Sequence, residues 1–388
     1  MKIGVLTHSK FSDNYGQILQ CFALQRFLLE LGHEAFLIRY DSDECYQCPR
    51  FAWLRYAIRF VLRLVSRKRR ELHKKILSIQ RAREINAIRN KVREFEKFAS
   101  DNIVSTAMYK SYEELKANPP CADAYVVGSD QVWNPGLNNP STAVWYLRFG
   151  PKGVRRIAYA ASFGRRIAAK ECAKLHEYLS TFYAIGVRED GALENCKRAG
   201  ESRARLVLDP TLLVPNTAYK SFICLNSKFP PYVFLYYLNV DSSEKIMWGQ
   251  IRDFVAKQHL AIIPVSSSGY LPAMDLIPDV ENYLPTVPEW LSEIAHAQYV
   301  ITTSFHGMIF AIIFHRPFAI IPLQGGCSEA NDRITSLLRQ LDLMDRIITG
   351  DNGIEKVLLS PIKWDWVDSK VDVLREESRR FLINAISW

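Results

Sequence analysis

The sequence of 388 residues has an ordinary globular composition, with 48% hydrophobic and 23% charged residues. These values exclude disordered and collagen-like proteins, and the length predicts two or three domains. The net charge of +9 is placed unevenly, because residues 50–97 carry sixteen Lys or Arg against four Asp or Glu. Because the basic character is confined to one segment without a nucleic-acid-binding motif, we expect no nucleic-acid partner.

The cysteines and the first residues both point to the cytoplasm. The eight cysteines are mostly scattered singly through apolar stretches, which is typical of free thiols in a reducing compartment. The opening MKIGVLTHSK lacks the apolar core of a secretory signal. Cys45 and Cys48 form one CxxC pair, but no second pair completes a zinc site, so we assign no metal ligands.

In chain order, apolar runs alternate with helical periodicity, the pattern of parallel α/β sheets. The first half predicts helices at 17–31 and 168–181 and strand segments at 2–7, 34–41, 123–130, 156–162, 182–190 and 204–213. The second half predicts strands at 232–239, 260–266, 299–304 and 317–323 and helices at 243–258, 288–296, 306–314, 331–341 and 366–387. An irregular stretch at 214–231 separates them. We therefore predict domains at 1–215 and 216–388, with the last helix packing back on the first domain.

Residues 51–98 interrupt this alternation. Arg55, Arg59, Arg63 and Arg67 are spaced four apart and would form one stripe on a helix. We predict a basic helical insertion at about 50–100 in the first domain. Two interpretations of segment 51–75 stay open. It either lies on the anionic inner face of the plasma membrane as an interfacial helix, or packs against the first domain with its arginines facing water.

The strongest local signal for function is Ser304-Phe305-His306-Gly307, between a β-branched run and an apolar helix. Serine is a favourable N-cap, and the N–H groups of a helix start at the carboxyl end of a strand bind anions. We predict that His306 lies in the first helical turn beside such an anion. The alternative is a buried histidine that a neighbouring carbonyl satisfies.

Two more strand ends carry polar groups. Ser129, Asp130 and Gln131 offer groups that bind hydroxyls, although a polar turn capped by Asp130 fits equally well. Arg188 suits bidentate binding of a carboxylate or phosphate, with a surface pair to Glu189 or another acid as the alternative. The sequence contains no GxGxxG, Walker A, GxSxG or HExxH motif, so dinucleotide, P-loop, serine-hydrolase and zinc-protease functions have no support.

These segments, in this order, resemble the polysaccharide pyruvyl transferase family. The resemblance rests on residues 14–34, 123–135, 156–164, 187–190, 208–213, 287–318 and 331–343. It implies an α/β fold of two Rossmann-like domains facing a cleft, similar to GT-B glycosyltransferases. It also implies transfer of a carboxyvinyl unit from phosphoenolpyruvate to two hydroxyls of one sugar, which gives a cyclic pyruvate ketal and phosphate. Phosphoenolpyruvate would be a co-substrate, and no cofactor is implied.

The resemblance assigns donor binding to Arg188 and to Ser304, Phe305, His306 and Gly307. Some family members have an arginine where this chain has Ser304, so another cation is needed. Arg165, Arg316 and Arg333 are candidates that the sequence does not rank. For the acceptor we predict contacts with His8, Asn14, Tyr15, Gly16, Ser129, Asp130 and Gln131.

Ketal formation requires a proton for the methylene carbon and a base for each attacking hydroxyl. We predict that His306 is the acid and Asp130 the base. The acceptor would be a capsular polysaccharide or exopolysaccharide, or a precursor of one that is either free or carried on polyprenyl diphosphate. The rival hypothesis is a GT-B-type glycosyltransferase that uses a nucleotide sugar, for which Glu329 is the only obvious residue to bind a ribose.

Overall fold

The computed structural model describes residues 1–11, 13–41, 88, 91–134, 142–267, 276–278 and 280–387. Segment 51–75, with its predicted membrane contact, lies outside these residues, as does most of the predicted basic insertion at 50–100. The described part of the insertion ends in α4. Within the described ranges, no helix combines the length and the apolar character needed to cross a membrane.

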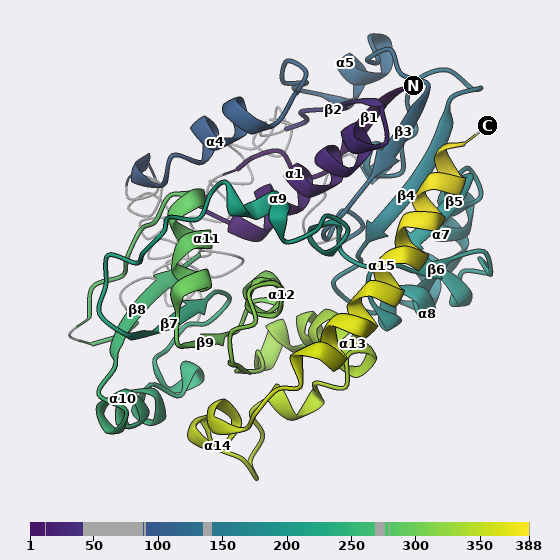
Figure 1. The fold of residues 1–388 in the computed structure, drawn as a ribbon. Helices are drawn as coiled ribbons and strands as arrows, with labels where there is room; N and C mark the ends of the chain where they lie inside the picture. Colours follow the sequence, from purple (N-terminus) through teal and green to yellow (C-terminus); the bar gives the residue numbers. More distant parts are fainter. Residues whose placement is uncertain are drawn as a thin grey trace, which may run out of the picture.

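The first domain is built on a six-stranded parallel sheet in the order β2-β1-β3-β4-β5-β6 (Figure 1). Its strands are β1 (Lys2–Leu6), β2 (Glu34–Leu37), β3 (Ala124–Val127), β4 (Arg155–Ala161), β5 (Ala184–Val187) and β6 (Arg205–Leu206). Its helices are α1 (Tyr15–Glu30), α4 (Phe95–Asn102), α5 (Tyr112–Ala117), α6 (Thr142–Trp145), α7 (Cys172–Leu179) and α8 (Asp190–Arg198). Every residue of β3 is buried, as expected for a sheet covered on both faces.

The second domain holds a four-stranded parallel sheet in the order β10-β9-β7-β8. Its strands are β7 (Tyr232–Tyr237), β8 (Ala261–Ser266), β9 (Tyr299–Thr302) and β10 (Phe318–Ile320). The helices from the linker onward are α9 (Thr217–Lys220), α10 (Trp248–Lys257), α11 (Val287–His296), α12 (Phe305–Ile313), α13 (Asp332–Gln340), α14 (Ile354–Leu359) and α15 (Trp364–Ile386). The predicted α/β fold with two Rossmann-like sheets is therefore confirmed.

The strand order fixes where a ligand can bind. In the first sheet the chain goes from β1 to β2 on one side and returns to β3 on the other, so the direction reverses between β1 and β3. In the second sheet the same reversal falls between β7 and β9. Parallel sheets bind ligands beyond the carboxyl ends of the strands at such switch points. The residues that follow β1, β3 and β9 include His8, Asp130 and His306.

Helices α1 and α15 both make contacts that join the domains. At the start of α1, the ring of Tyr15 stacks on Trp290 of α11 at a centroid distance of 4.9 Å, and its hydroxyl donates to the carbonyl of Pro285 at 2.7 Å. The last helix, α15, runs back along the first sheet (Figure 1). There the Oγ of Ser378 accepts from the N–H of Leu208 at 2.9 Å, and Arg155 of β4 donates to the carbonyl of Ala385 at 3.2 Å.

Candidate active site

The start of α12 has the predicted cap. The side chain of Ser304 accepts a hydrogen bond from the N–H of Gly307 at 3.3 Å, so Ser304 is the N-cap. His306 lies in the first helical turn and is 6% exposed. The cap and the place of His306 in the first turn agree with the sequence-based prediction, and the bound anion stays a prediction. The first N–H groups of α12 have no carbonyl one turn earlier within the helix, and the side chain of His306 in this turn reaches Asp209 of the first domain.

Gly16 makes room for His306. A methyl group on the α-carbon of Gly16 would come within 2.0 Å of His306 Nδ1. Only glycine allows α1 of the first domain and the imidazole of the second domain to approach this closely. The predicted acceptor contact of Gly16 stays a prediction, and in the structure the close neighbour of this glycine is the histidine.

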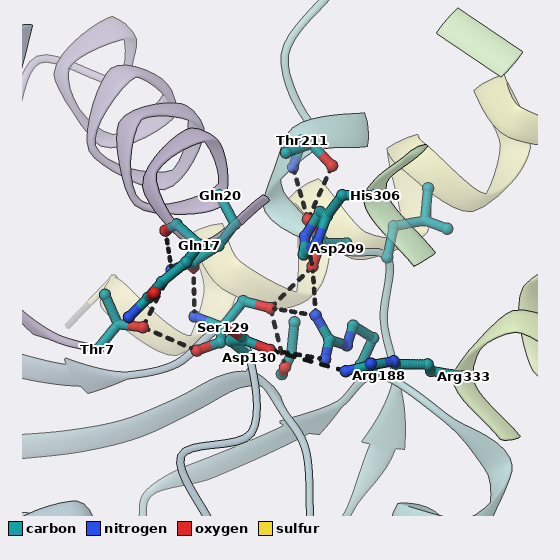
Figure 2. Close-up of polar contacts among 12 residues, drawn as sticks. Thr7, Gln17, Gln20, Ser129, Asp130, Arg188, Asp209, Thr211, His306 and Arg333 are labelled. Atoms are coloured by element: carbon teal, nitrogen blue, oxygen red, sulfur yellow. Dashed lines mark hydrogen bonds and ion pairs between the residues drawn. The ribbon is translucent and has the colours of Figure 1, made fainter. Parts of the chain in front are cut away.

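Arg188 is the centre of a buried ion-pair cluster (Figure 2). It lies directly after β5, and its side chain is 1% exposed. Its Nη1 donates to Asp209 Oδ2 at 2.9 Å and its Nη2 donates to Asp130 Oδ1 at 3.2 Å, while its Nε lies 3.6 Å from Glu189 Oε2. The guanidinium also lies over the ring of Phe305, 4.7 Å from its centroid. Arg188 does pair with Glu189, but inside the protein and together with two other carboxylates.

The cluster continues to His306. The Nε2 of His306 lies 3.5 Å from Asp209 Oδ2, within ion-pair range but long for a hydrogen bond. Asp209 also accepts from Ser129 Oγ at 2.9 Å and from Thr211 Oγ1 at 2.8 Å. The carboxylate of Asp209 is thus shared between Arg188 of the first domain and His306 of the second.

Burial and paired charges set the protonation of the three acids. Burial alone would raise the pKa of Asp130, but Arg188, both neighbouring histidines and Arg333 lower it to about 2. The pKa of Asp209 is likewise held far below its usual range, because His306 and Arg188 outweigh burial. For Glu189, burial outweighs the attraction of Arg188 and raises the pKa. Asp130 and Asp209 are therefore fixed as carboxylates.

The loop of Ser129 and Asp130 is held by α1 and β1. The N–H of Ser129 donates to Gln20 Oε1 at 3.1 Å, and Thr7 Oγ1 donates to the Ser129 carbonyl at 2.9 Å (Figure 2). Gly128 precedes this loop with a φ of +112°, and a Cβ there would lie 2.1 Å from the Tyr159 carbonyl. Glycine at position 128 therefore lets this loop approach the neighbouring strand β4 closely.

The other predicted acceptor residues are held mainly by the protein itself. Asn14 is the N-cap of α1 and accepts from Gln17 N–H at 3.1 Å, and Tyr15 is buried in the domain interface. Gln131 is 4% exposed and its Oε1 accepts from Asn134 at 2.7 Å. His8 packs against Trp145, and burial lowers its pKa despite the nearby Asp130.

The structure ranks the candidates for a second cation. Arg333 Nη1 lies 4.0 Å from Asp130 Oδ1, and its guanidinium carbon is 6.0 Å from the centroid of Phe305. Arg165 is held by Glu171 through two hydrogen bonds of 2.7 and 3.2 Å. Arg316 donates to the carbonyls of Phe314 and Ala297, behind α12. Of the three, Arg333 is the one that joins the cluster.

A pocket of about 330 Å³ adjoins the cluster at the domain boundary. The first domain contributes the loop after β4 and the beginning of α8, and the second domain contributes the segment before α13 and the beginning of that helix. The pocket is lined by Ser162, Gly164, Arg165, Arg166, Glu189, Gly191, Ala192, Glu194, Asn195, Glu329, Ala330, Asp332 and Arg333. Glu189 and Arg333 belong to the pocket and to the neighbourhood of Arg188, so they connect the two.

Sequence reasoning gave no role to Asp209, Gln20 or Glu189. Asp209 follows the short strand β6, as Asp130 follows β3. An acidic residue after a predicted strand could therefore have indicated that Asp209 belongs to the site. Gln20 lies in the middle of an apolar helix, and a buried glutamine there indicates a polar partner. In the part of the chain that the structure describes, no group of three His, Cys, Asp or Glu could hold a metal ion, and Cys45 and Cys48 lie outside that part.

Two parallel α/β domains, with a charged cluster where strand ends of the first sheet meet the start of α12, have the architecture of a GT-B-like fold. In a comparison with solved structures, UDP-N-acetylglucosamine 2-epimerase from Rickettsia bellii matches 99% of this chain and 96% of its own, with 10% identity and a TM-score of 0.53. UDP-GlcNAc 2-epimerase from Neisseria meningitidis bound to UDP-GlcNAc matches with 9% identity over 100% and 95% of the two chains and a TM-score of 0.43. An α-glucosyltransferase in complex with UDP and a 13-mer DNA matches with 10% identity over 98% and 94%, with a TM-score of 0.47. At these identities the similarity concerns the fold alone.

The comparison with protein families is more specific. The polysaccharide pyruvyl transferase model matches residues 14–324. The chain therefore belongs to the polysaccharide pyruvyl transferase family, as its motifs indicated, and is a transferase for which the family implies a polysaccharide acceptor. A comparison with curated protein sequences finds no match.

Proposed function

We propose that this enzyme transfers a carboxyvinyl unit from phosphoenolpyruvate to two hydroxyls of one sugar, in a polysaccharide or its precursor, and releases phosphate. The observation that carries the proposal is the position of His306. It begins α12 at the switch point of the second sheet, and its Nε2 lies 3.5 Å from a carboxylate that is fixed in the charged form. An imidazole beside a carboxylate at the start of a helix suits a small anionic donor that must be protonated.

The donor's anionic groups would bind the first turn of α12 and Arg333. A helix N-terminus and an arginine both favour phosphate and carboxylate. Arg188 is already surrounded by three carboxylates, so its part in donor binding would be to hold Asp130 and Asp209 beside the donor. This arrangement makes up for the serine at position 304.

His306 would deliver a proton to the methylene carbon of phosphoenolpyruvate while C2 gains positive charge. Asp209 would orient the imidazolium and stabilise its charge before the transfer. Asp130, at the end of β3, would accept the hydrogen of an attacking acceptor hydroxyl. The C2–O bond to phosphate then breaks, and the second hydroxyl completes the ketal.

The test compares phosphoenolpyruvate with nucleotide sugars. Purified enzyme is titrated with phosphoenolpyruvate and with UDP-glucose in a calorimeter, and phosphate release is then measured with a panel of hexose glycosides as acceptors. The proposal predicts binding of phosphoenolpyruvate and acceptor-dependent phosphate release. Binding of UDP-glucose without binding of phosphoenolpyruvate would instead identify a glycosyltransferase.

The setting of the reaction remains a prediction from the sequence. We expect a cytoplasmic enzyme in capsule or exopolysaccharide synthesis, held at the membrane through segment 51–75 when its acceptor is carried on polyprenyl diphosphate. Liposome flotation tests this expectation. Binding to phosphatidylglycerol vesicles should be lost at high salt and when Arg59, Arg63 and Arg67 are changed to Gln.

A further inference from the structure

The proposed reaction needs more bases than the sequence identified. Each of the two acceptor hydroxyls gives up a proton, one proton goes to the methylene carbon, and the other leaves with phosphate or solvent. Asp130 is the one base assigned so far, and its Oδ1 is the atom that approaches both Arg188 and Arg333. The following inference rests on the proposed function and concerns the second base and the place of the acceptor.

The pocket beside the cluster has the chemistry of a sugar site. Its charged residues are three arginines and four acids, and the acids are Glu189, Glu194, Glu329 and Asp332. A donor with phosphate and carboxylate groups would meet a wall with a negative balance. A sugar offers many hydroxyls that can donate to carboxylates and accept from guanidinium groups. The volume of about 330 Å³ is at the lower end of the range for small-ligand pockets and suits one sugar ring.

Glu189 is the acid that joins this pocket to the reaction centre. It is 4% exposed, and its Oε2 has no hydrogen-bond partner among the described residues. A buried carboxylate oxygen without a donor is costly, so an unsatisfied one in the wall of a pocket indicates a ligand that donates to it. Arg188 Nε is 3.6 Å away and is itself without a hydrogen bond, which keeps Glu189 beside the cluster without saturating it.

The electrostatic surroundings distinguish the two acids as bases. Asp130, whose pKa is about 2, is a weak proton acceptor. Burial raises the pKa of Glu189, so once ionised it takes up a proton more readily. The charged groups that face it are Arg188 beside it in the chain and Asp332 and Arg333 on α13, with Arg165, Arg166, Glu194 and Glu329 farther around the pocket.

We propose that this pocket binds the acceptor sugar and that Glu189 removes the proton from one of its two attacking hydroxyls. The hydroxyl oxygen forms a bond to C2 as its O–H bond breaks, and the proton passes to Glu189 Oε2. The other hydroxyl is served by Asp130, which pairs with a different nitrogen of the Arg188 guanidinium. Glu189 is regenerated when it releases the proton to the departing phosphate or to solvent.

The first experiment measures ketal formation by Glu189→Gln, which keeps the size of the side chain but cannot take up a proton. We expect kcat to fall by about 100- to 10,000-fold, with the Kd for phosphoenolpyruvate changed less than about threefold. Glu189→Asp should recover part of the activity. Glu177→Gln is the matched control, because Glu177 is an exposed partner of Arg148 and is not among the residues that line the pocket, and it should keep wild-type turnover.

The second experiment blocks the pocket without touching the cluster. Glu194 is exposed at the pocket edge, so Glu194→Trp should fold normally and raise the acceptor KM by about tenfold while donor binding is unchanged. This variant tests the site even when Glu189→Gln does not fold.

The outcomes distinguish a failure of the proposed function from a failure of the assignment of Glu189 and its pocket. Wild-type enzyme that releases no phosphate from phosphoenolpyruvate with any acceptor overturns the proposed function, and this inference with it. Active wild-type enzyme with more than a tenth of its kcat left in Glu189→Gln, or an unchanged acceptor KM in Glu194→Trp, overturns the inference alone. A loss of donor affinity in Glu189→Gln also overturns it, because Glu189 would then act on the donor side.

Discussion

The two sides of Arg188 differ sharply in their access to solvent. On one side, Asp209 is fully buried and is held by Arg188, Ser129, Thr211 and His306. On the other, Glu189 and Arg333 face a pocket of about 330 Å³. Buried charges are tolerated only when they are paired, whereas a binding site needs polar groups that are still available. Arg188 thus holds a closed, charge-balanced cluster and also forms the edge of an open site.

The largest effect is expected when His306, which contacts Asp209 in the buried cluster, is replaced. His306→Ala should lower the rate of transfer by about 100- to 10,000-fold, because general acid catalysis is lost. The melting temperature should change by only a few degrees, since Asp209 keeps its other partners. Phosphate release and thermal unfolding are the measurements. His315→Ala, at an exposed histidine paired with Asp368, is the control, and a variant that keeps a tenth of wild-type turnover contradicts the assignment.

The next substitution removes Arg188, the central cation of the buried cluster. Arg188→Met leaves Asp130, Asp209 and Glu189 without their common cation, and we expect the free energy of unfolding to fall by about 3–5 kcal/mol. Urea denaturation measures this change. Arg26→Met, which removes an exposed pair with Glu30, should cost less than about 0.5 kcal/mol. Equal losses in the two variants would mean that the cluster is not the charge-balanced unit described above.

A smaller effect is expected from adding a methyl group beside His306 in the buried cluster. Gly16→Ala places a methyl group against His306, and overpacking of this kind costs about 1–3 kcal/mol. The shifted imidazole should also lower turnover, while the Kd for phosphoenolpyruvate changes less. Gly249→Ala on α10 is the matched control. Its new methyl group meets nothing within 4 Å, so it should stabilise the helix by about 0.5–1 kcal/mol. Wild-type activity in Gly16→Ala would show that the imidazole position is not set by α1.

The smallest effect concerns the charge of Asp130. Its pKa is about 2 in the folded chain and 3.8 in the unfolded one, so the carboxylate stabilises the protein by about 2 kcal/mol above the unfolded value. This contribution should disappear as the pH falls from about 4 through about 2. Urea denaturation across this range checks the prediction, with Asp130→Asn expected to flatten that part of the curve and exposed Asp253→Asn to leave it unchanged. A parallel curve for Asp130→Asn would contradict it.

Local sequence patterns were sufficient to predict the fold and the helix start at Ser304. Buried strands and a serine before an apolar helix depend on neighbours in the chain, and these are visible in a sequence. The pair with Glu189, the next residue in the chain, was a stated alternative, but the contacts of Arg188 with Asp130 and Asp209 were not predictable. These two acids follow other strands and meet Arg188 only when the strand ends come together at one edge of the sheet. Arg333 could not be distinguished from Arg165 or Arg316 for the same reason.

Helix α8 was also absent from the sequence-based prediction. Its residues DGALENCKR include Gly191 and Asn195, which are weak helix formers. In the structure its start is held by the other domain, since Gly191 N–H donates to Asp332 Oδ2 at 2.9 Å and Asp190 N–H donates to Ser336 Oγ at 3.0 Å. The pocket wall that contains Glu189 therefore depends on contacts across the domain boundary, which local propensity does not encode.

The return of α15 to the first sheet has a practical consequence for protein engineering. Val367, Val371, Leu382 and Ile386 of this helix are buried, and its Ser378 and Ala385 bond to residues of the first domain. The two Rossmann-like halves are consequently not two consecutive pieces of chain. An enzyme assembled from the halves of two relatives needs two crossover points, one near 215 and one before Trp364, because a single cut near 215 would give the first sheet a terminal helix made for another.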